Sequence, residues 1–159
     1  MAYFYFEAFA QLHVYKEGGR SMQVTVTHIK GMHFEGEGQS KLKTQIDSSV
    51  TTGGSGYGSS PMELVLMAVA GCSGMDIVTI LEKMRITYER LEISVVGERA
   101  AEHPRIFTDV ELTFKFWGSN LPQEKLLRAI QLSMEKYCSV ANMIDKVANL
   151  TYKLETYPN

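Results

Sequence analysis

The sequence predicts an α+β domain whose strands and helices follow the order βββ-α-ββ-α-β. Segments of polar–apolar alternation come in pairs joined by short turns, and only two long helical segments separate them. The regular alternation of strand and helix that builds a doubly wound sheet is missing. We therefore expect antiparallel sheets around a central buried helix.

Size and charge limit the range of functions. The chain has 159 residues, 45% of them hydrophobic and 21% charged, which are the proportions of a single globular domain. A formal net charge of -2 provides no overall attraction to nucleic acids or anionic membranes, and we expect neither as a partner. Two cysteines without a Cys-x-x-Cys pair exclude a disulfide-rich secreted scaffold and a four-cysteine zinc site on one chain.

The first 21 residues differ in character from the rest of the chain. Residues 3–6 are consecutive aromatics, and residues 17–21 resemble a linker. We interpret residues 1–21 as an N-terminal extension or tag, with an edge strand of the fold as the alternative, and residues 22–159 as one domain. The segment lacks the basic and apolar regions of a signal peptide, which predicts a cytoplasmic protein with reduced thiols.

Three strands are expected before the first helix. Residues 22–30 alternate and are rich in β-branched side chains, residues 32–35 follow a turn, and residues 41–47 alternate again. The glycine-rich segment 51–60 is expected to be a flexible loop. Its glycine spacing departs from nucleotide-binding patterns and no lysine follows, so nucleotide binding is not predicted.

A long helix is predicted from Pro61 to about Met84. Ser60 is a favourable N-cap, proline fits the first helical position, and Glu63 completes a capping box. The uncharged stretch 64–75 has 12 residues, fewer than the roughly 20 that cross a bilayer. We expect this helix to be buried at the centre of the domain.

The second half of the chain predicts two paired strands, a second helix and a last strand. Residues 91–96 and 109–116 alternate on either side of a polar turn, and the last strand covers residues 150–154. The helix begins at Pro122, and Cys138 lies at its end or at the start of a short further helix. The side chains expected to form the core-facing stripe of the second helix are Leu126, Leu127, Ile130, Met134 and Tyr137.

Cys72 is the first candidate for chemistry, because small residues surround it. Gly71 and Gly74 each cost about 1 kcal/mol relative to alanine inside a helix, so their presence needs a reason. Close packing of another segment is one reason, and access of a small substrate to the sulfur is the other. An inert buried thiol is the simplest alternative.

Cys138 and two charged residues are further candidates. A new helical turn at Cys138 would lower the pKa of its thiol through the amide dipoles, whereas a small apolar residue in a helix seam is the alternative. Glu63 is most economically a capping-box residue, and Arg105 a cation of the turn between two strands. The four histidines form no metal-binding or hydrolase motif.

Four segments, taken in order, form a specific pattern. They are SPMELVL at 60–66, AGCSGMD at 70–76, HPRIF at 103–107 and EKYCSV at 135–140. This pattern resembles the OsmC/Ohr family, and within it the OsmC-like branch rather than the organic-hydroperoxide-resistance proteins proper. The resemblance extends from about Met22 to the C-terminus and includes the order of strands and helices. It implies an intertwined homodimer with two sites at the subunit interface.

The resemblance also implies a thiol-dependent peroxidase that reduces organic (alkyl) hydroperoxides without metal, haem or flavin. We therefore expect no cofactor and no metal. Cys72 matches the peroxidatic cysteine and Cys138 the resolving cysteine, which restores the first through a disulfide that a dithiol reductant then opens. The expected catalytic set is Cys72, Cys138, Glu63 and Arg105.

Two departures from the family peroxidases support alternatives. Residues 22–60 contain no arginine to match the early-strand arginine of the family, and Met62 stands where the family has its glutamate, one position before Glu63. Arg105 or Arg99 is the candidate substitute for the arginine. A redox-sensing or small-ligand-binding dimer with little or no turnover is therefore the second hypothesis. An enzyme with a cysteine nucleophile for acyl transfer is the third.

Overall fold

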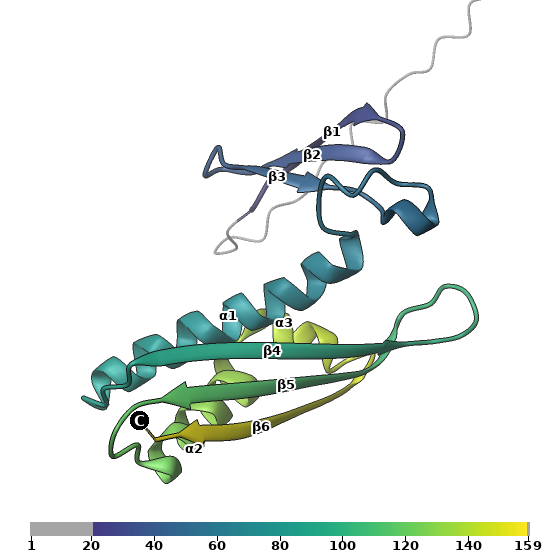
Figure 1. Ribbon diagram of the computed structural model, residues 1–159. Coiled ribbons are helices and arrows are strands. Elements are labelled where there is room, and N and C mark those ends of the chain that lie inside the picture. Colours follow the sequence, from purple (N-terminus) through teal and green to yellow (C-terminus); the bar gives the residue numbers. More distant parts are fainter. Residues whose placement is uncertain (1–20, 159) are drawn as a thin grey trace, which may run out of the picture.

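The computed structural model describes residues 21–158, which contain two separate three-stranded sheets (Figure 1). The first sheet is an antiparallel meander in the order β1-β2-β3, as the sequence predicts. It stands apart from the rest of the domain, and the chain that leaves it leads into the long helix (Figure 1). Strand β1 spans Thr25–Lys30, β2 spans His33–Glu37 and β3 spans Lys43–Ile46.

The second sheet has the order β4-β5-β6 and combines antiparallel with parallel pairing. Strands β4 (Arg90–Arg99) and β5 (Phe107–Trp117) form a long hairpin, whereas β6 (Asn149–Tyr157) runs parallel to β5. The expectation of antiparallel sheets is therefore wrong for the last strand. The helices between β5 and β6 carry the chain back along the sheet, and such a crossover is what joins parallel neighbours.

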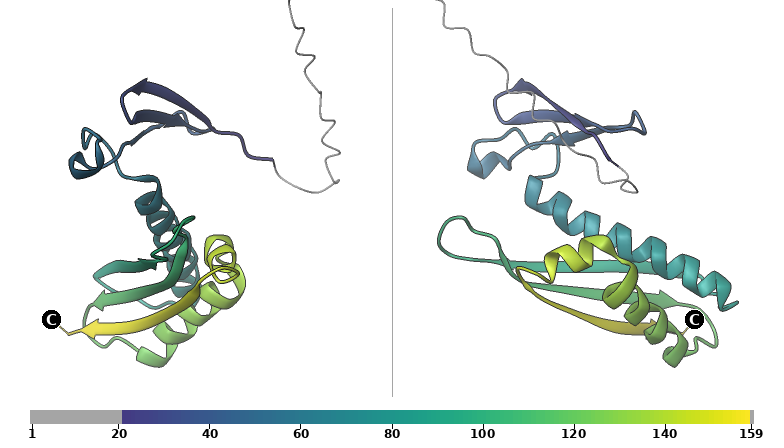
Figure 2. Two further views of the ribbon diagram at one scale, coloured as in Figure 1. Left: turned by 90° about the vertical axis from the view of Figure 1, so that its right-hand side faces the viewer. Right: turned by 180° about the vertical axis from the view of Figure 1, so that it is seen from behind.

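Three α-helices lie on one face of the second sheet (Figure 2). The mixed α+β class is confirmed, and the short helix that follows Cys138 is separate from the one before it. The helical segments are α1 at Pro61–Lys83, α2 at Gln123–Leu132, a π-helical turn η2 at Ser133–Tyr137, α3 at Ser139–Ile144, and a 3-10 turn η1 at Val50–Thr52.

The core lies between this helical layer and the central strand β5. Alternate side chains of β5 are buried, as its period-2 pattern predicts. The predicted stripe of the second helix is correct for Leu126, Ile130 and Met134, which are buried. It is wrong for Leu127, which is 39% exposed, and for Tyr137, which is 50% exposed. Leu127 lies one residue, about 100°, beyond the buried side of α2, and Tyr137 ends the wider π-helical turn.

Helix α1 begins as its sequence signals predict. The Ser60 hydroxyl accepts a hydrogen bond from the Glu63 N–H, and the Glu63 carboxylate accepts one from the Ser60 N–H. With 23 residues, α1 is long and apolar enough to cross a membrane, but one of its sides packs against the domain. The expected complete burial is not reached within a single chain. The buried residues of α1 are Val69, Ser73, Gly74, Ile77 and Leu81.

The glycine-rich loop has a defined conformation, in contrast to the predicted flexible loop. The buried Asp47 carboxylate accepts three backbone hydrogen bonds, from the N–H groups of Ser48 at 2.7 Å, Ser55 at 3.0 Å and Tyr57 at 3.1 Å. A Cβ at Gly54 would lie 1.9 Å from the Ser48 carbonyl oxygen, so the backbone contact there requires glycine. The sequence pattern missed this order because the organising carboxylate lies outside the glycine-rich stretch.

Replacing Asp47 by asparagine should lower the melting temperature by several degrees at neutral pH, because the amide keeps one acceptor oxygen and its NH₂ group cannot accept the bonds made to the other carboxylate oxygen. Burial raises the pKa of the Asp47 carboxyl, but the bonds from Tyr57, Ser48 and Ser55 outweigh it and bring that pKa below its ordinary value. The carboxylate therefore stabilises the fold above about pH 4, and this contribution disappears as the pH falls through the folded-state pKa. Thermal unfolding of both proteins at several pH values measures the difference, which should shrink in acid; a difference independent of pH would contradict the assignment.

Candidate functional site

The two cysteines of the chain lie next to each other in space. The Sγ atoms of Cys72, in the middle of α1, and Cys138, just before α3, lie within 4.8 Å of each other and of a carboxylate oxygen of Asp76. The π-helical turn before Cys138 brings this residue close to α1. The Cys138 N–H donates a hydrogen bond of 2.8 Å to the Ser133 carbonyl oxygen and so closes the turn, and the chain then enters α3. The structure therefore brings together both of the cysteines singled out in the sequence.

The two glycines beside Cys72 have different surroundings. A Cβ at Gly74 would lie 3.0 Å from Cδ1 of Ile93, so this glycine allows α1 to approach β4 closely. A Cβ at Gly71 would meet no atom within 4 Å, and Gly71 lines a groove of about 830 Å³ between α1 and β4. Close packing therefore accounts for Gly74, whereas the helix is open at Gly71.

Cys138 is a fully buried thiol at the N-cap of α3. Its Sγ accepts a hydrogen bond from the Ala141 N–H at 3.3 Å. The expectation that a helix start lowers the pKa of this thiol is wrong. Burial raises the pKa of Cys138 to about 12, outweighing the Ala141 hydrogen bond, and the neighbouring Cys72 raises it further. Cys138 is therefore a protonated thiol at neutral pH, which disfavours it as the sulfur of the first attack.

Asp76 is a site residue that the sequence reasoning missed. It lies four positions after Cys72, so both side chains project from the same side of α1. The Oγ of the buried Ser133 lies 3.1 Å from Oδ2 of Asp76 and 3.3 Å from the Ser73 carbonyl oxygen, and it donates its hydrogen to this pair of acceptors. The four-residue spacing was the available signal, whereas the contacts with Ser133 and Cys138 depend on the π-helical turn.

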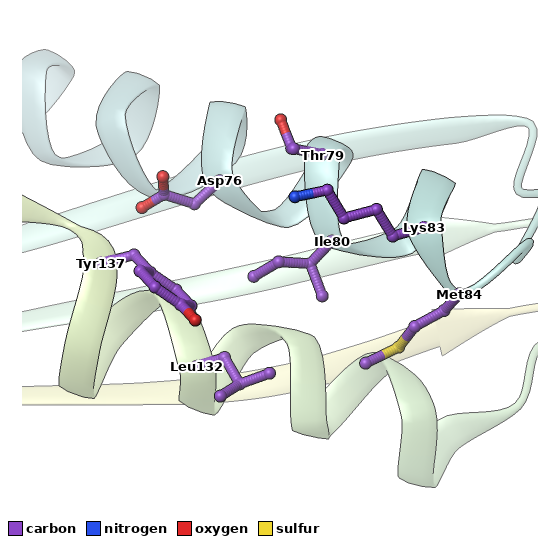
Figure 3. Close-up of a pocket in the computed structure, with 7 residues that line it drawn as sticks. All are labelled: Asp76, Thr79, Ile80, Lys83, Met84, Leu132 and Tyr137. Atoms are coloured by element: carbon purple, nitrogen blue, oxygen red, sulfur yellow. The ribbon is translucent and has the colours of Figure 1, made fainter.

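A cavity of about 380 Å³ opens beside Asp76, between α1 and the α2–η2 segment (Figure 3). Ile80, Met84 and Leu132 give it an apolar wall, and its volume is in the range of small-molecule sites. A hydrocarbon group can lie on that wall while a polar end reaches the Asp76 carboxylate, which is adjacent to both thiols. The lining residues are Asp76, Thr79, Ile80, Lys83, Met84, Leu132 and Tyr137.

The structure does not bring Glu63 or Arg105 to the cysteines within one chain. The hydrogen bonds from Ser60 in the capping box hold the pKa of Glu63 below its ordinary value, and Glu63 lies roughly 13.5 Å from Cys72 along the helix axis. Arg105 is exposed in the β4–β5 turn, where its carbonyl accepts a bond from Nε of Arg99 at 2.7 Å. Among residues 21–158, no hydrogen bond or ion pair joins either side chain to a cysteine.

The arrangement supports two-electron thiol chemistry. A half-buried thiol can meet a small oxidant, and a second thiol in reach can then form a disulfide with it. The sulfur atoms of a disulfide lie about 2.05 Å apart, so the two Sγ atoms have to approach by less than about 3 Å.

Comparison with known proteins identifies relatives of this chain. Residues 53–153 match the family model described as OsmC-like protein. Protein YhfA of Escherichia coli (strain K12) is 42% identical over 135 residues, which are 84% of this chain and 97% of the relative. The match therefore spans nearly the whole relative, and the positions of both cysteines lie within the residues that match the family model.

Solved structures share the fold. A hypothetical protein from Aquifex aeolicus VF5 is 27% identical and has a TM-score of 0.79, over 89% of this chain and 99% of that one. An organic hydroperoxide resistance protein OsmC from Legionella pneumophila is 17% identical with a TM-score of 0.66, over 86% of this chain and 97% of that one. At that identity the second likeness is one of fold.

Proposed function

Because this chain belongs to the OsmC-like protein family, we propose that it is a thiol-dependent peroxidase that reduces organic hydroperoxides through Cys72 and Cys138. The observation that carries the proposal is the convergence of the only two thiols of the chain on Asp76, which lines a cavity with an apolar wall. A structural neighbour named as an organic hydroperoxide resistance protein supports the choice of oxidant.

The first step is an attack by the Cys72 thiolate on the terminal oxygen of the hydroperoxide. The S–O bond forms, the O–O bond breaks, and its electron pair leaves on the alkoxide. A carboxylate oxygen of Asp76 lies within 4.8 Å of the Cys72 sulfur, and we assign Asp76 to receive the thiol proton and to return it to the alkoxide, which leaves as an alcohol. Ser133 positions that carboxylate.

The second step joins the two sulfurs. The Cys138 thiol attacks the Cys72 sulfenic acid, a disulfide forms, and the hydroxyl leaves with the Cys138 proton as water. Two thiols have then supplied the two electrons that reduce one hydroperoxide to alcohol and water. A dithiol reductant restores the pair by thiol–disulfide exchange, and a cytoplasmic location would supply it.

Counting thiols before and after the addition of one equivalent of an alkyl hydroperoxide tests this proposal. The reduced chain should show two reactive thiols after denaturation and the treated chain none, with a mass loss of about 2 Da and a Cys72–Cys138 peptide link. A dithiol should restore both thiols and sustain repeated turnover. Two thiols that survive the treatment would overturn the proposal.

A redox sensor of limited turnover is the second candidate, and one observation favours it. Among the described residues, no arginine or lysine makes a hydrogen bond or ion pair with either cysteine or with Asp76. A cation would lower the pKa of the attacking thiol and so speed the first step. The sensor predicts one oxidation per chain with no sustained turnover in the presence of a dithiol, whereas the peroxidase predicts continuous turnover.

We also propose that the chain forms a homodimer with its sites near the subunit interface. All six residues of β1 are exposed, and the first sheet stands apart from the rest of the chain (Figure 1). On α1, Met67 and Met75 are exposed, and Met75 lines the groove beside Gly71. A second copy of the chain would cover these apolar surfaces, and a permanent dimer would bury at least about 2,000 Å².

A further inference from the structure

Three metal-donor atoms converge at the centre of the helical layer. They are Sγ of Cys72, Sγ of Cys138 and a carboxylate oxygen of Asp76, all within 4.8 Å of one another. We propose that the reduced protein binds a thiophilic divalent cation of the zinc type at these three residues. The inference goes beyond the peroxidase, because it needs only the reduced thiols and no hydroperoxide.

The spacing of the donors is close to what zinc requires. Zinc–sulfur bonds of about 2.3 Å at tetrahedral angles place two sulfur ligands about 3.8 Å apart. A largest separation of 4.8 Å therefore leaves about 1 Å for the side chains to close around the ion. Cys72 and Asp76 lie four residues apart on one helix, a spacing that puts two ligands on the same side.

The neighbouring hydrogen bonds hold two of the three ligands in place. The Ser133 hydroxyl donates to Oδ2 of Asp76, and the Ala141 N–H donates to Sγ of Cys138. Partners of this kind orient metal ligands and commonly change the affinity for the ion 10- to 100-fold. Because the ligands come from α1 and from the start of α3, a bound ion would join these two helices.

The ligand types determine which ions fit. Two thiolates select Zn²⁺ or Cd²⁺ over Mg²⁺ and Ca²⁺, which prefer sites made only of oxygen. Three protein ligands leave one position of a tetrahedral ion for solvent, and one of the ligands, Asp76, lines the cavity of about 380 Å³. Each thiol loses its proton when it binds the ion, so binding releases protons.

Metal binding and disulfide formation exclude each other, because they use the same two sulfurs. The bound ion would protect the resting dithiol, and oxidation to the disulfide would release the ion. In the overall change two thiolates, one hydroperoxide and two protons give the disulfide, an alcohol and water. The expectation of a peroxidase reaction without metal is unaffected, since the ion would occupy only the reduced, resting site.

The test is a titration of the reduced, metal-free full chain with Zn²⁺ in competition with a chromophoric chelator, repeated with Cd²⁺. We expect one ion per chain, an ultraviolet sulfur-to-cadmium charge-transfer band, and no competition from Mg²⁺ or Ca²⁺. Cys72→Ser and Cys138→Ser should each weaken binding more than about 100-fold, and Asp76→Asn at least about tenfold. Glu82→Gln, which removes an exposed carboxylate from the same helix, should not change it.

Three outcomes would overturn the inference: no stoichiometric binding, binding that survives either cysteine substitution, or an unchanged affinity in Asp76→Asn. If a variant fails to fold, two measurements on the wild-type chain still test the metal site. Zn²⁺ should slow the alkylation of both cysteines, and the disulfide form should bind no ion. The titration contains no hydroperoxide, and turnover is measured with a chelator present. The metal site and the peroxidase can therefore fail independently.

Discussion

Replacing Cys72 by serine should reduce hydroperoxide consumption to the rate of the buffer alone. A serine hydroxyl cannot be oxidised by this route, and the remaining Cys138 is buried with a pKa raised to about 12, so it offers almost no thiolate at neutral pH. The measurement is the loss of an alkyl hydroperoxide in the presence of a dithiol. Far-ultraviolet circular dichroism checks that the variant is folded.

Replacing Cys138 by serine should have a different effect and serves as the matched control. Cys72 should still consume about one equivalent of hydroperoxide per site and then stop, because no second thiol resolves the sulfenic acid. Under excess hydroperoxide Cys72 should advance to the sulfinic acid, which adds two oxygens to the mass. Wild-type activity in both single variants, or a sulfenic acid formed at Cys138 alone, would show that the roles are assigned wrongly.

A glutamate in place of Met75 should convert the proposed dimer into monomers. Met75 is 69% exposed in the single chain and lines the groove between α1 and β4 that a second copy would cover. A two-fold symmetric interface would contain the new charge twice, and each unpaired buried charge costs several kcal/mol. Light scattering at micromolar concentration measures the mass.

Thr151→Glu is the control for this substitution, because Thr151 is exposed on β6 in the sheet rather than on α1. This variant should remain dimeric. A Met75→Glu protein that keeps the mass and dissociation constant of a dimer would remove the α1 groove from the interface. A wild-type chain that is monomeric at micromolar concentration would refute the dimer itself.

Local signals in the sequence were sufficient for most of the fold. The capping box at Ser60 and Glu63 set the start of α1, and the alternation in residues 109–116 identified β5 with its buried side. Hydrogen bonds of a cap and the period of a strand involve residues within a few positions of each other. Such patterns can therefore be recognised without knowing where the rest of the chain lies.

The same local signals did not determine the pairing of β6. The alternation of Leu150, Tyr152 and Leu154 describes a strand equally well in either direction. The path of α2, η2 and α3 decides that β6 runs parallel to β5. The extent of burial of α1 likewise depends on which elements pack against it. Several apolar side chains of α1 stay exposed, because the rest of a single chain covers only part of the helix surface.

At the candidate site, the sequence indicated both cysteines, and the tertiary structure decided their neighbours. Asp76 and Ser133 join the site because a π-helical turn brings the end of the second helix against α1, and that turn has no short-range signature. The tertiary structure also decided the direction of the Cys138 pKa shift. A helix start lowers the pKa of a thiol, but complete burial disfavours the charged form more strongly, and burial is a property of the whole packed chain.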